Sequence, residues 1–199
     1  MAEVLFEKRG HLGVVTLNRP QAVNALTSGM VHAMLEQLTA WADDDAVKTV
    51  LVRGAGDRGL CAGGDIVAIY DDMLRHGDQT ADFWAAEYRL NSLISRYPKP
   101  YVAFMDGLVL GGGVGISAHG SVRVVTERTR TGMPETTIGF VPDVGGTLLL
   151  SRSPGESGTH AALTGAHLSG ADALFLGLAD HFVPSESLPA LAEALESST

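Results

Sequence analysis

The sequence is poor in cysteine, in basic side chains and in long apolar runs. Its single cysteine, Cys61, leaves no internal disulfide, and no charged-then-apolar leader opens the chain, so we expect a reducing, cytoplasmic setting. With 14 Lys and Arg against 23 Asp and Glu, the formal charge of -9 argues against nucleic acid as a partner, because nucleic-acid binders carry a concentrated basic face. No apolar stretch approaches the roughly 20 residues that span a bilayer, so we expect a soluble protein without a membrane partner.

Several common catalytic signatures are also missing. Ser117 lacks the second glycine of a nucleophile elbow, and no G-x-x-x-x-G-K-[ST] motif for a nucleoside triphosphate is present. The segment 54–59 does match G-x-G-x-x-G after a strand, but residues 60–64 postpone the helix that a dinucleotide site would begin within the motif. We therefore expect no nicotinamide cofactor. We also expect no metal, since the histidines show neither metal-ligand spacing nor cysteine partners: His119, His160, His167 and His181.

What the chain does contain is enough apolar sequence for one core. At 199 residues and 45% hydrophobic content, with no linker, residues 1–199 are predicted to form a single domain. A unit of strand, glycine turn and helix recurs along it, which predicts an α/β fold. Predicted strands are 4–7, 12–17, 47–53, 101–105 and 121–126. Predicted helices are one capped by Thr27, then 66–76, 80–96, 114–118, and a mainly helical pattern from Gly145 onward. The first of these helices is predicted from apolar residues that recur at helical spacing and should face the core: Met30, Met34, Leu35, Leu38 and Trp41.

Two glycine clusters, 61–65 and 111–115, directly follow strand-like runs. A strand that enters a helix through glycines leaves the first helical N–H groups unpaired and open to a ligand. The N–H groups of Gly64 and Gly112 are therefore candidates for an oxyanion hole, in which two amides converge on one carbonyl oxygen. The alternative is that these glycines only let helices pack closely on strands.

Two carboxylates follow the glycine clusters in a proline-containing loop, Glu135 after Pro134 and Asp143 after Pro142. Proline fixes φ before each acid, which favours aimed side chains, so both are candidate catalytic residues and Glu135 is the candidate base or nucleophile. The alternatives are structural: Glu135 suits the first turn of a short helix, and Asp143 could cap the helix that begins near Gly145.

Taken together, these motifs resemble the crotonase, or enoyl-CoA hydratase/isomerase, superfamily. The resemblance implies a crotonase-like spiral of β-β-α units that binds an acyl-CoA, with the thioester oxygen held by the amides of Gly64 and Gly112. It runs nearly end to end, through the segments Leu17-Asn18-Arg19-Pro20, Asn24-Ala25-Leu26, Cys61-Ala62-Gly63-Gly64-Asp65-Ile66, Gly111-Gly112-Gly113, Pro134-Glu135, Ile138-Gly139, Gly145-Gly146 and Leu163-Thr164-Gly165.

Within the superfamily, the similarity is greatest to the 3-hydroxyisobutyryl-CoA hydrolases. It lies in the segments 97–101, 105–107, 111–117, 119–120, 133–136 and 142–146. A hydratase uses two glutamates, and the first of those positions is Gly115 here. The resemblance therefore implies a thioester hydrolase of valine catabolism in which Glu135 attacks the thioester or activates water, while Asp143 positions or protonates groups around the leaving thiolate. It also implies contacts to substrate from Glu87, for which a polar position on an amphipathic helix is an equal alternative, and along the CoA path from Ala62, Gly63, Asp65, Asn24, Ala25 and Leu26.

Hydrolases of this type continue for well over a hundred further residues, so the usual C-terminal helical region is expected to be absent. The resemblance implies no cofactor besides the coenzyme A of the substrate, and a homo-oligomer such as a trimer or hexamer. Two other functions stay open: an enoyl-CoA hydratase or isomerase, and a non-catalytic CoA-binding remnant.

Overall fold

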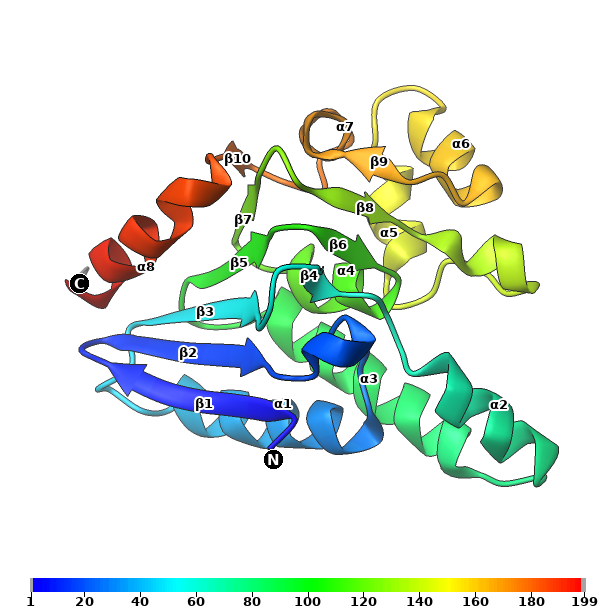
Figure 1. Cartoon of the computed structure of the whole chain (residues 1–199), viewed down its shortest axis with the longest axis horizontal. Helices are drawn as coiled ribbons and strands as arrows, with labels where there is room; N and C mark the ends of the chain where they lie inside the picture. The colour runs from blue at the N-terminus through cyan, green and yellow to red at the C-terminus, as the bar shows by residue number, and fades with distance from the viewer. Residues whose placement is uncertain (1, 198–199) are drawn as a thin grey trace.

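The computed structural model describes residues 2–197, which form two sheets surrounded by helices (Figure 1). The larger sheet has the order β1-β2-β3-β5-β7-β10 and the smaller one β4-β6-β8-β9. The strands are β1 Val4–Arg9, β2 Leu12–Leu17, β3 Thr49–Gly54, β4 Gly59–Cys61, β5 Tyr101–Met105, β6 Leu108–Leu110, β7 Val122–Val125, β8 Arg130–Gly132, β9 Leu168–Ser169 and β10 His181–Phe182. The α-helices are α1 Ser28–Ala42, α2 Ile66–Leu74, α3 Gln79–Ser95, α4 Gly112–Ser117, α5 Gly146–Ser151, α6 Ser157–Thr164, α7 Gly170–Phe175 and α8 Leu188–Ser197, with 3-10 turns η1 Pro20–Ala22, η2 Pro134–Ile138 and η3 Ser185–Ser187.

The chain advances as a spiral of β-β-α turns. In each turn the first strand joins the larger sheet, as β3, β5 and β7 do, and the second joins the smaller one, as β4, β6 and β8 do. Neighbouring strands of successive turns pair in parallel, so the carboxyl ends of β4, β6 and β8 lie at one edge of the smaller sheet. The predicted α/β spiral is confirmed, and this edge is where the ligand crevice of a parallel sheet is expected.

A hydrophobic core lies between the larger sheet and helices α1 and α3. Helix α1 buries Met30, Met34, Leu38 and Trp41, whose helical spacing predicted this face. Thr27 caps it as expected, because the Thr27 side chain accepts a hydrogen bond of 3.2 Å from the Met30 amide. None of the helices described in residues 2–197 is both long and apolar enough to cross a bilayer.

Predicted and observed elements agree best where an element is long. The strands of the opening hairpin, α3 and β5 begin and end within two residues of the predicted ranges, and α2 ends two residues early. The sequence did not predict the short strands β4, β6 and β8, because three residues are too few for an alternating pattern. Those three strands form the edge from which the candidate site is built.

Asn24 connects two loops that lie far apart in the sequence. It is fully buried and lies at φ 55°. Its side-chain amide donates hydrogen bonds of 3.0 Å to the carbonyls of Ala55 and Gly59, and its side-chain oxygen accepts one from the Arg19 amide. Asparagine tolerates this left-handed backbone better than most residues. Asn24 is therefore a structural residue in this fold and does not line the cavity described below.

We predict that Asn24→Ala lowers the free energy of unfolding by about 2–4 kcal/mol, because it removes buried hydrogen bonds and leaves their partners unpaired. Urea unfolding measures the change. Asn24→Gly keeps the backbone freedom but loses the same bonds, so it should be destabilised almost as much. Full stability of the glycine variant would show that the hydrogen bonds contribute nothing.

Candidate active site

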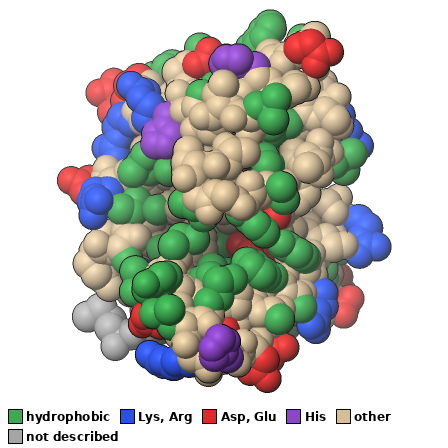
Figure 2. All heavy atoms as spheres, turned by 90° about the vertical axis from the view of Figure 1, so that its right-hand side faces the viewer, with side chains coloured by type: hydrophobic (Ala, Val, Ile, Leu, Met, Phe, Trp, Pro, Cys, Tyr) green, Lys and Arg blue, Asp and Glu red, His purple; other side chains and the backbone are tan. Residues whose placement is uncertain are grey.

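A cavity of about 520 Å³ opens at the carboxyl edge of the smaller sheet, a size typical of small-molecule sites. Helices α2 and α3 form one wall, and η2 with the loop after it forms the other. Figure 2 shows hydrophobic side chains gathered around this hollow with acidic side chains inside it. The exposed apolar side chains that line the cavity are Ile66, Tyr70 and Met73 of α2 and Ile138 of η2.

The floor of the cavity consists of the two glycine turns. Parallel pairing of β4 with β6 brings Gly63-Gly64 beside Gly111-Gly112. A Cβ placed on Gly112 would lie 3.4 Å from the Gly64 nitrogen, and one placed on Gly63 would lie 3.6 Å from the Gly112 nitrogen. Within residues 2–197, neither of these amides donates a hydrogen bond. The structure therefore brings together the two N–H groups that the sequence predicted to converge, and both are free.

Glu135 lies against this floor. It sits in the first turn of η2 but only 8% of it is exposed, and its Oε1 would be 2.7 Å from a Cβ on Gly111. Its Oε2 has no partner among the described residues. Burial raises the pKa of Glu135 to about 7, so the carboxyl can both take up and release a proton near neutral pH.

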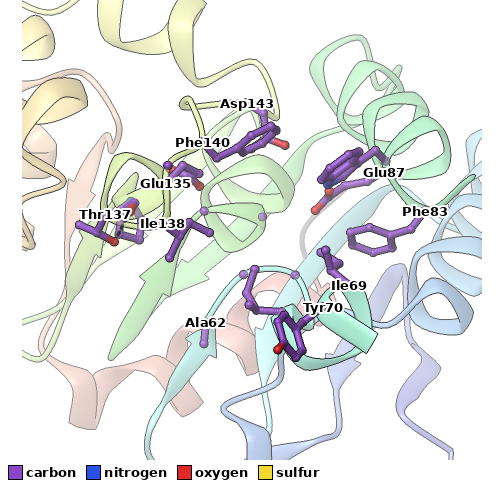
Figure 3. A pocket seen from close by; sticks show the side chains of 18 of the residues that line it. Ala62, Ile69, Tyr70, Phe83, Glu87, Glu135, Thr137, Ile138, Phe140 and Asp143 are labelled. Carbon is purple, nitrogen blue, oxygen red and sulfur yellow. Dashed lines mark hydrogen bonds between the residues drawn. The ribbon is translucent and has the colours of Figure 1, made fainter. Parts of the chain in front are cut away.

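Glu87 reaches the same floor from α3, on the opposite wall (Figure 3). It is only 2% exposed, which does not fit the alternative of a polar position on an amphipathic helix. Its Oε1 has no partner within the described part of the chain and would overlap a Cβ on Gly112. Burial, followed by the charges of Asp143 and Glu135, raises the pKa of Glu87 to about 8.

Asp143 completes a group of acids around the cavity. Its Oδ2 accepts a hydrogen bond of 2.8 Å from the Tyr88 hydroxyl of α3. The alternative that Asp143 caps the following helix is wrong, because the cap residue of α5 is Gly145 and no side chain caps it. Burial raises the pKa of Asp143, and the hydrogen bond from Tyr88 opposes that rise. No Lys or Arg of residues 2–197 lines this cavity, so the acids have no basic counter-charge there.

The other predicted contact residues divide into two sets. Ala62 and Gly63 line the cavity. Asp65 does not: its side chain caps α2 by accepting from the Ala68 amide and forms an ion pair of 3.0 Å with Arg19. Leu26 is buried and would lie 3.2 Å from a Cβ on Gly112, so it supports the floor from beneath. Ala25, like Asn24, lies outside the cavity lining, and its carbonyl accepts a hydrogen bond of 2.6 Å from Arg19.

Sequence reasoning missed the aromatic residues that meet the acid-bearing loop. Besides Tyr88, the ring of Trp84 on α3 stacks on Phe140 with centroids 5.3 Å apart and planes at 7°. It also missed Asn91, a buried residue whose side-chain nitrogen and oxygen lack partners among the described residues. The available signal was the four-residue spacing of Trp84 and Tyr88, which places them on one helix face, but nothing in the sequence marks what that face meets.

The fold and the cavity define an α/β protein with paired free amides and a cluster of acids at one sheet edge. Residues 12–199 match the family model described as enoyl-CoA hydratase/isomerase, and the chain belongs to this family, the crotonases. A carnitinyl-CoA dehydratase from Mycobacterium thermoresistibile is 57% identical in sequence, with a TM-score of 0.98, and the match covers 100% of this chain and 58% of that one.

Among curated proteins, the 3-hydroxyisobutyryl-CoA hydrolase of Xenopus tropicalis, named as mitochondrial, is 49% identical over 97% of this chain and 50% of its own length. The small ribosomal subunit protein mS47 of Neurospora crassa is 42% identical over 97% of this chain and 39% of its own length. This chain thus spans about half the length of the curated hydrolases it matches.

We predict that Glu87→Gln makes stability less dependent on pH. The carboxyl has a folded pKa of about 8, above that of an unfolded glutamate, so the folded state holds the proton more tightly and stability falls as pH rises from about 5 to 9. The variant cannot ionise and should be more stable than the natural protein at pH 9 by a few kcal/mol, with little difference at pH 5.

Urea unfolding at both pH values tests this. Glu36→Gln replaces an exposed carboxyl on α1 and serves as the matched control. Equal pH dependence of stability in the natural protein and in Glu87→Gln would show that folding does not raise the pKa of Glu87.

Proposed function

We propose that this chain carries the catalytic centre of an acyl-CoA thioester hydrolase that acts on 3-hydroxyisobutyryl-CoA or a similar short 3-hydroxyacyl-CoA. The observation that supports it most is that a buried glutamate with a free oxygen lies beside two free backbone amides. The 49% identity to a named 3-hydroxyisobutyryl-CoA hydrolase supports the same choice of substrate. The proposed reaction needs no metal or cofactor other than the coenzyme A of the substrate.

The amides and Glu135 carry the first step. With the thioester oxygen placed between the nitrogens of Gly64 and Gly112, both N–H groups donate to the negative charge that develops on it, and loss of one such donor typically costs about 3 kcal/mol. In one route Glu135 attacks the thioester carbon, the carbon–sulfur bond breaks to release the thiolate, and water hydrolyses the resulting anhydride. In the other route Glu135 removes a proton from a water molecule, which attacks the same carbon and displaces the thiolate. A pKa of about 7 suits either role near neutral pH.

The other acids act on the two ends of the acyl group. Asp143 lies beyond Glu135 in the same loop and positions groups around the departing thiolate. Glu87 has a free Oε1 beside Gly112 and accepts a hydrogen bond from the 3-hydroxyl group of the substrate. Ala62 and Gly63 contact the pantetheine arm through their backbone where they line the cavity.

A second reading, hydration of an enoyl-CoA, draws support from the similarity to the carnitinyl-CoA dehydratase. By the family resemblance, Gly115 occupies the position of the additional glutamate in hydratases, and it has no room for a side chain. A Cβ there would lie 2.7 Å from the Val144 Cβ and 2.9 Å from the Asn91 amide nitrogen. The packing around Gly115 therefore favours hydrolysis.

The similarity to a ribosomal protein supports a third reading, a non-catalytic CoA-binding or partner-binding protein. Saturable CoA binding without turnover of any thioester would establish it. A trimeric or hexameric assembly and a cytoplasmic location remain predictions, and solution mass and cell fractionation test them directly.

We predict that Glu135→Gln lowers the rate of thiol release from 3-hydroxyisobutyryl-CoA by about 100-fold to 10,000-fold, because the amide cannot act as base or nucleophile. A thiol-reactive dye follows the coenzyme A set free. Glu186→Gln, at an exposed position in η3, should retain full activity. Similar thiol release by the natural protein and by Glu135→Gln would rule out this role for Glu135.

We also predict that Gly115→Glu gains no hydration of crotonyl-CoA and is destabilised, since even the Cβ overlaps Val144. Overpacking of this kind typically costs about 1–3 kcal/mol. Loss of the enoyl absorbance and the melting temperature are the two measurements. Gly29→Ala is the control, because its Cβ would meet only the Thr27 hydroxyl at 3.8 Å. A stable, hydrating Gly115→Glu protein would contradict the steric argument.

A further inference from the structure

Helix α3 contacts the loop between η2 and α5 at two points one helical turn apart. Trp84 stacks on Phe140, and Tyr88 donates its hydroxyl hydrogen to Asp143. Trp84 and Phe140 both line the cavity, whereas Tyr88 does not and is 41% exposed. The Tyr88 hydroxyl thus reaches Asp143 without becoming part of the cavity wall.

The backbone on the other side of Asp143 is fixed separately. Gly146 donates its amide hydrogen to the Asp143 carbonyl, which closes a tight turn with Val144 at φ 45° and Gly145 at φ 77°. A β-branched residue with positive φ is strained. Two contacts hold Val144 there: its side chain is buried against Gly115, and its carbonyl oxygen accepts from Nε2 of His119 at 2.7 Å.

With the backbone held on both sides, the freedom left to Asp143 is rotation of its side chain. The Tyr88 hydroxyl is the one side-chain hydrogen-bond donor to its carboxylate within residues 2–197. The titratable groups that face Asp143 are Glu87 and Tyr88 on α3 and Glu135 on η2, and the charge of Asp143 raises the pKa of both glutamates. Burial disfavours the ionised form of Asp143 itself, and the donor from Tyr88 opposes both this effect and the rotation.

We infer that Tyr88 is a positioning residue: its hydroxyl holds the Asp143 carboxylate, in its ionised form, toward the cavity. The inference rests on the proposed hydrolase function only for its effect on rate. The hydrogen bond itself, which holds the Asp143 carboxylate and favours its ionised form, can be measured in the protein without substrate.

The test is the titration of Asp143, followed by carbon-13 NMR of protein labelled at the aspartate carboxyls and assigned with Asp143→Asn. Tyr88→Phe should raise the pKa of Asp143 by about one unit, because the charged form loses its donor. Difluorotyrosine at position 88 keeps the ring and makes the hydroxyl a stronger donor, so it should shift the same pKa downward. The matched control is Tyr97→Phe, which removes a hydroxyl that donates to the Leu38 carbonyl at 2.7 Å, away from the cavity.

In the hydrolase assay, Tyr88→Phe should lower kcat about tenfold and change KM by less than about twofold, because Tyr88 does not touch the substrate. An unchanged Asp143 titration in Tyr88→Phe, an equal shift in Tyr97→Phe, or an unchanged kcat in an active protein would overturn the inference. If the natural protein releases no thiol, the hydrolase proposal fails, and the titration still decides the role of Tyr88.

Discussion

Parallel pairing of three short strands is the constraint on which the rest of the site depends. β4, β6 and β8 each have only three residues, but their register places their carboxyl ends side by side. The turn after β4 contributes Gly64, the turn after β6 contributes Gly112, and the turn after β8 leads into Glu135. Groups about seventy residues apart in sequence, the difference between 64 and 135, therefore meet at one edge of a sheet.

The absence of side chains on that edge lets acids approach the backbone. Oxygens of Glu87 and Glu135 occupy the space that a Cβ on Gly112 and on Gly111 would need. Removed from water and close to one another, these carboxyls bind protons more tightly than free glutamate does. The packing that buries these acids therefore also raises their pKa values, so the fold and the proton chemistry depend on the same glycines.

Sequence patterns predicted the parts of the molecule in which many residues repeat one signal. The apolar spacing of Met30, Met34 and Leu38 predicted α1, and the run from Tyr101 to Met105 predicted β5. They predicted Glu135, Asp143 and the glycine amides as a group, because glycine and proline limit the local backbone.

Side-chain environments were not predictable in the same way. For Glu87 the sequence left a substrate contact and a polar position on a helix equally open, and only the fold buries it at the floor of the cavity. The resemblance implied a ligand contact for Asn24, whose side-chain amide instead bonds the carbonyls of Ala55 and Gly59. The spacing of Trp84 and Tyr88 places them on one helix face, but it does not reveal the partner of Tyr88, which lies 55 residues away in the chain. Such contacts arise from how distant turns of the spiral stack, which no local pattern encodes.

Within residues 2–197, no lysine or arginine lines the cavity, and this bears on the proposed turnover. Under the proposed hydrolysis, an uncharged thioester group gives a carboxylic acid, which would form among acidic side chains with no basic partner in that lining. Where one of those side chains is ionised, like-charge repulsion disfavours retention of the product as an anion. The proposed enzyme would therefore hold its acid product only weakly.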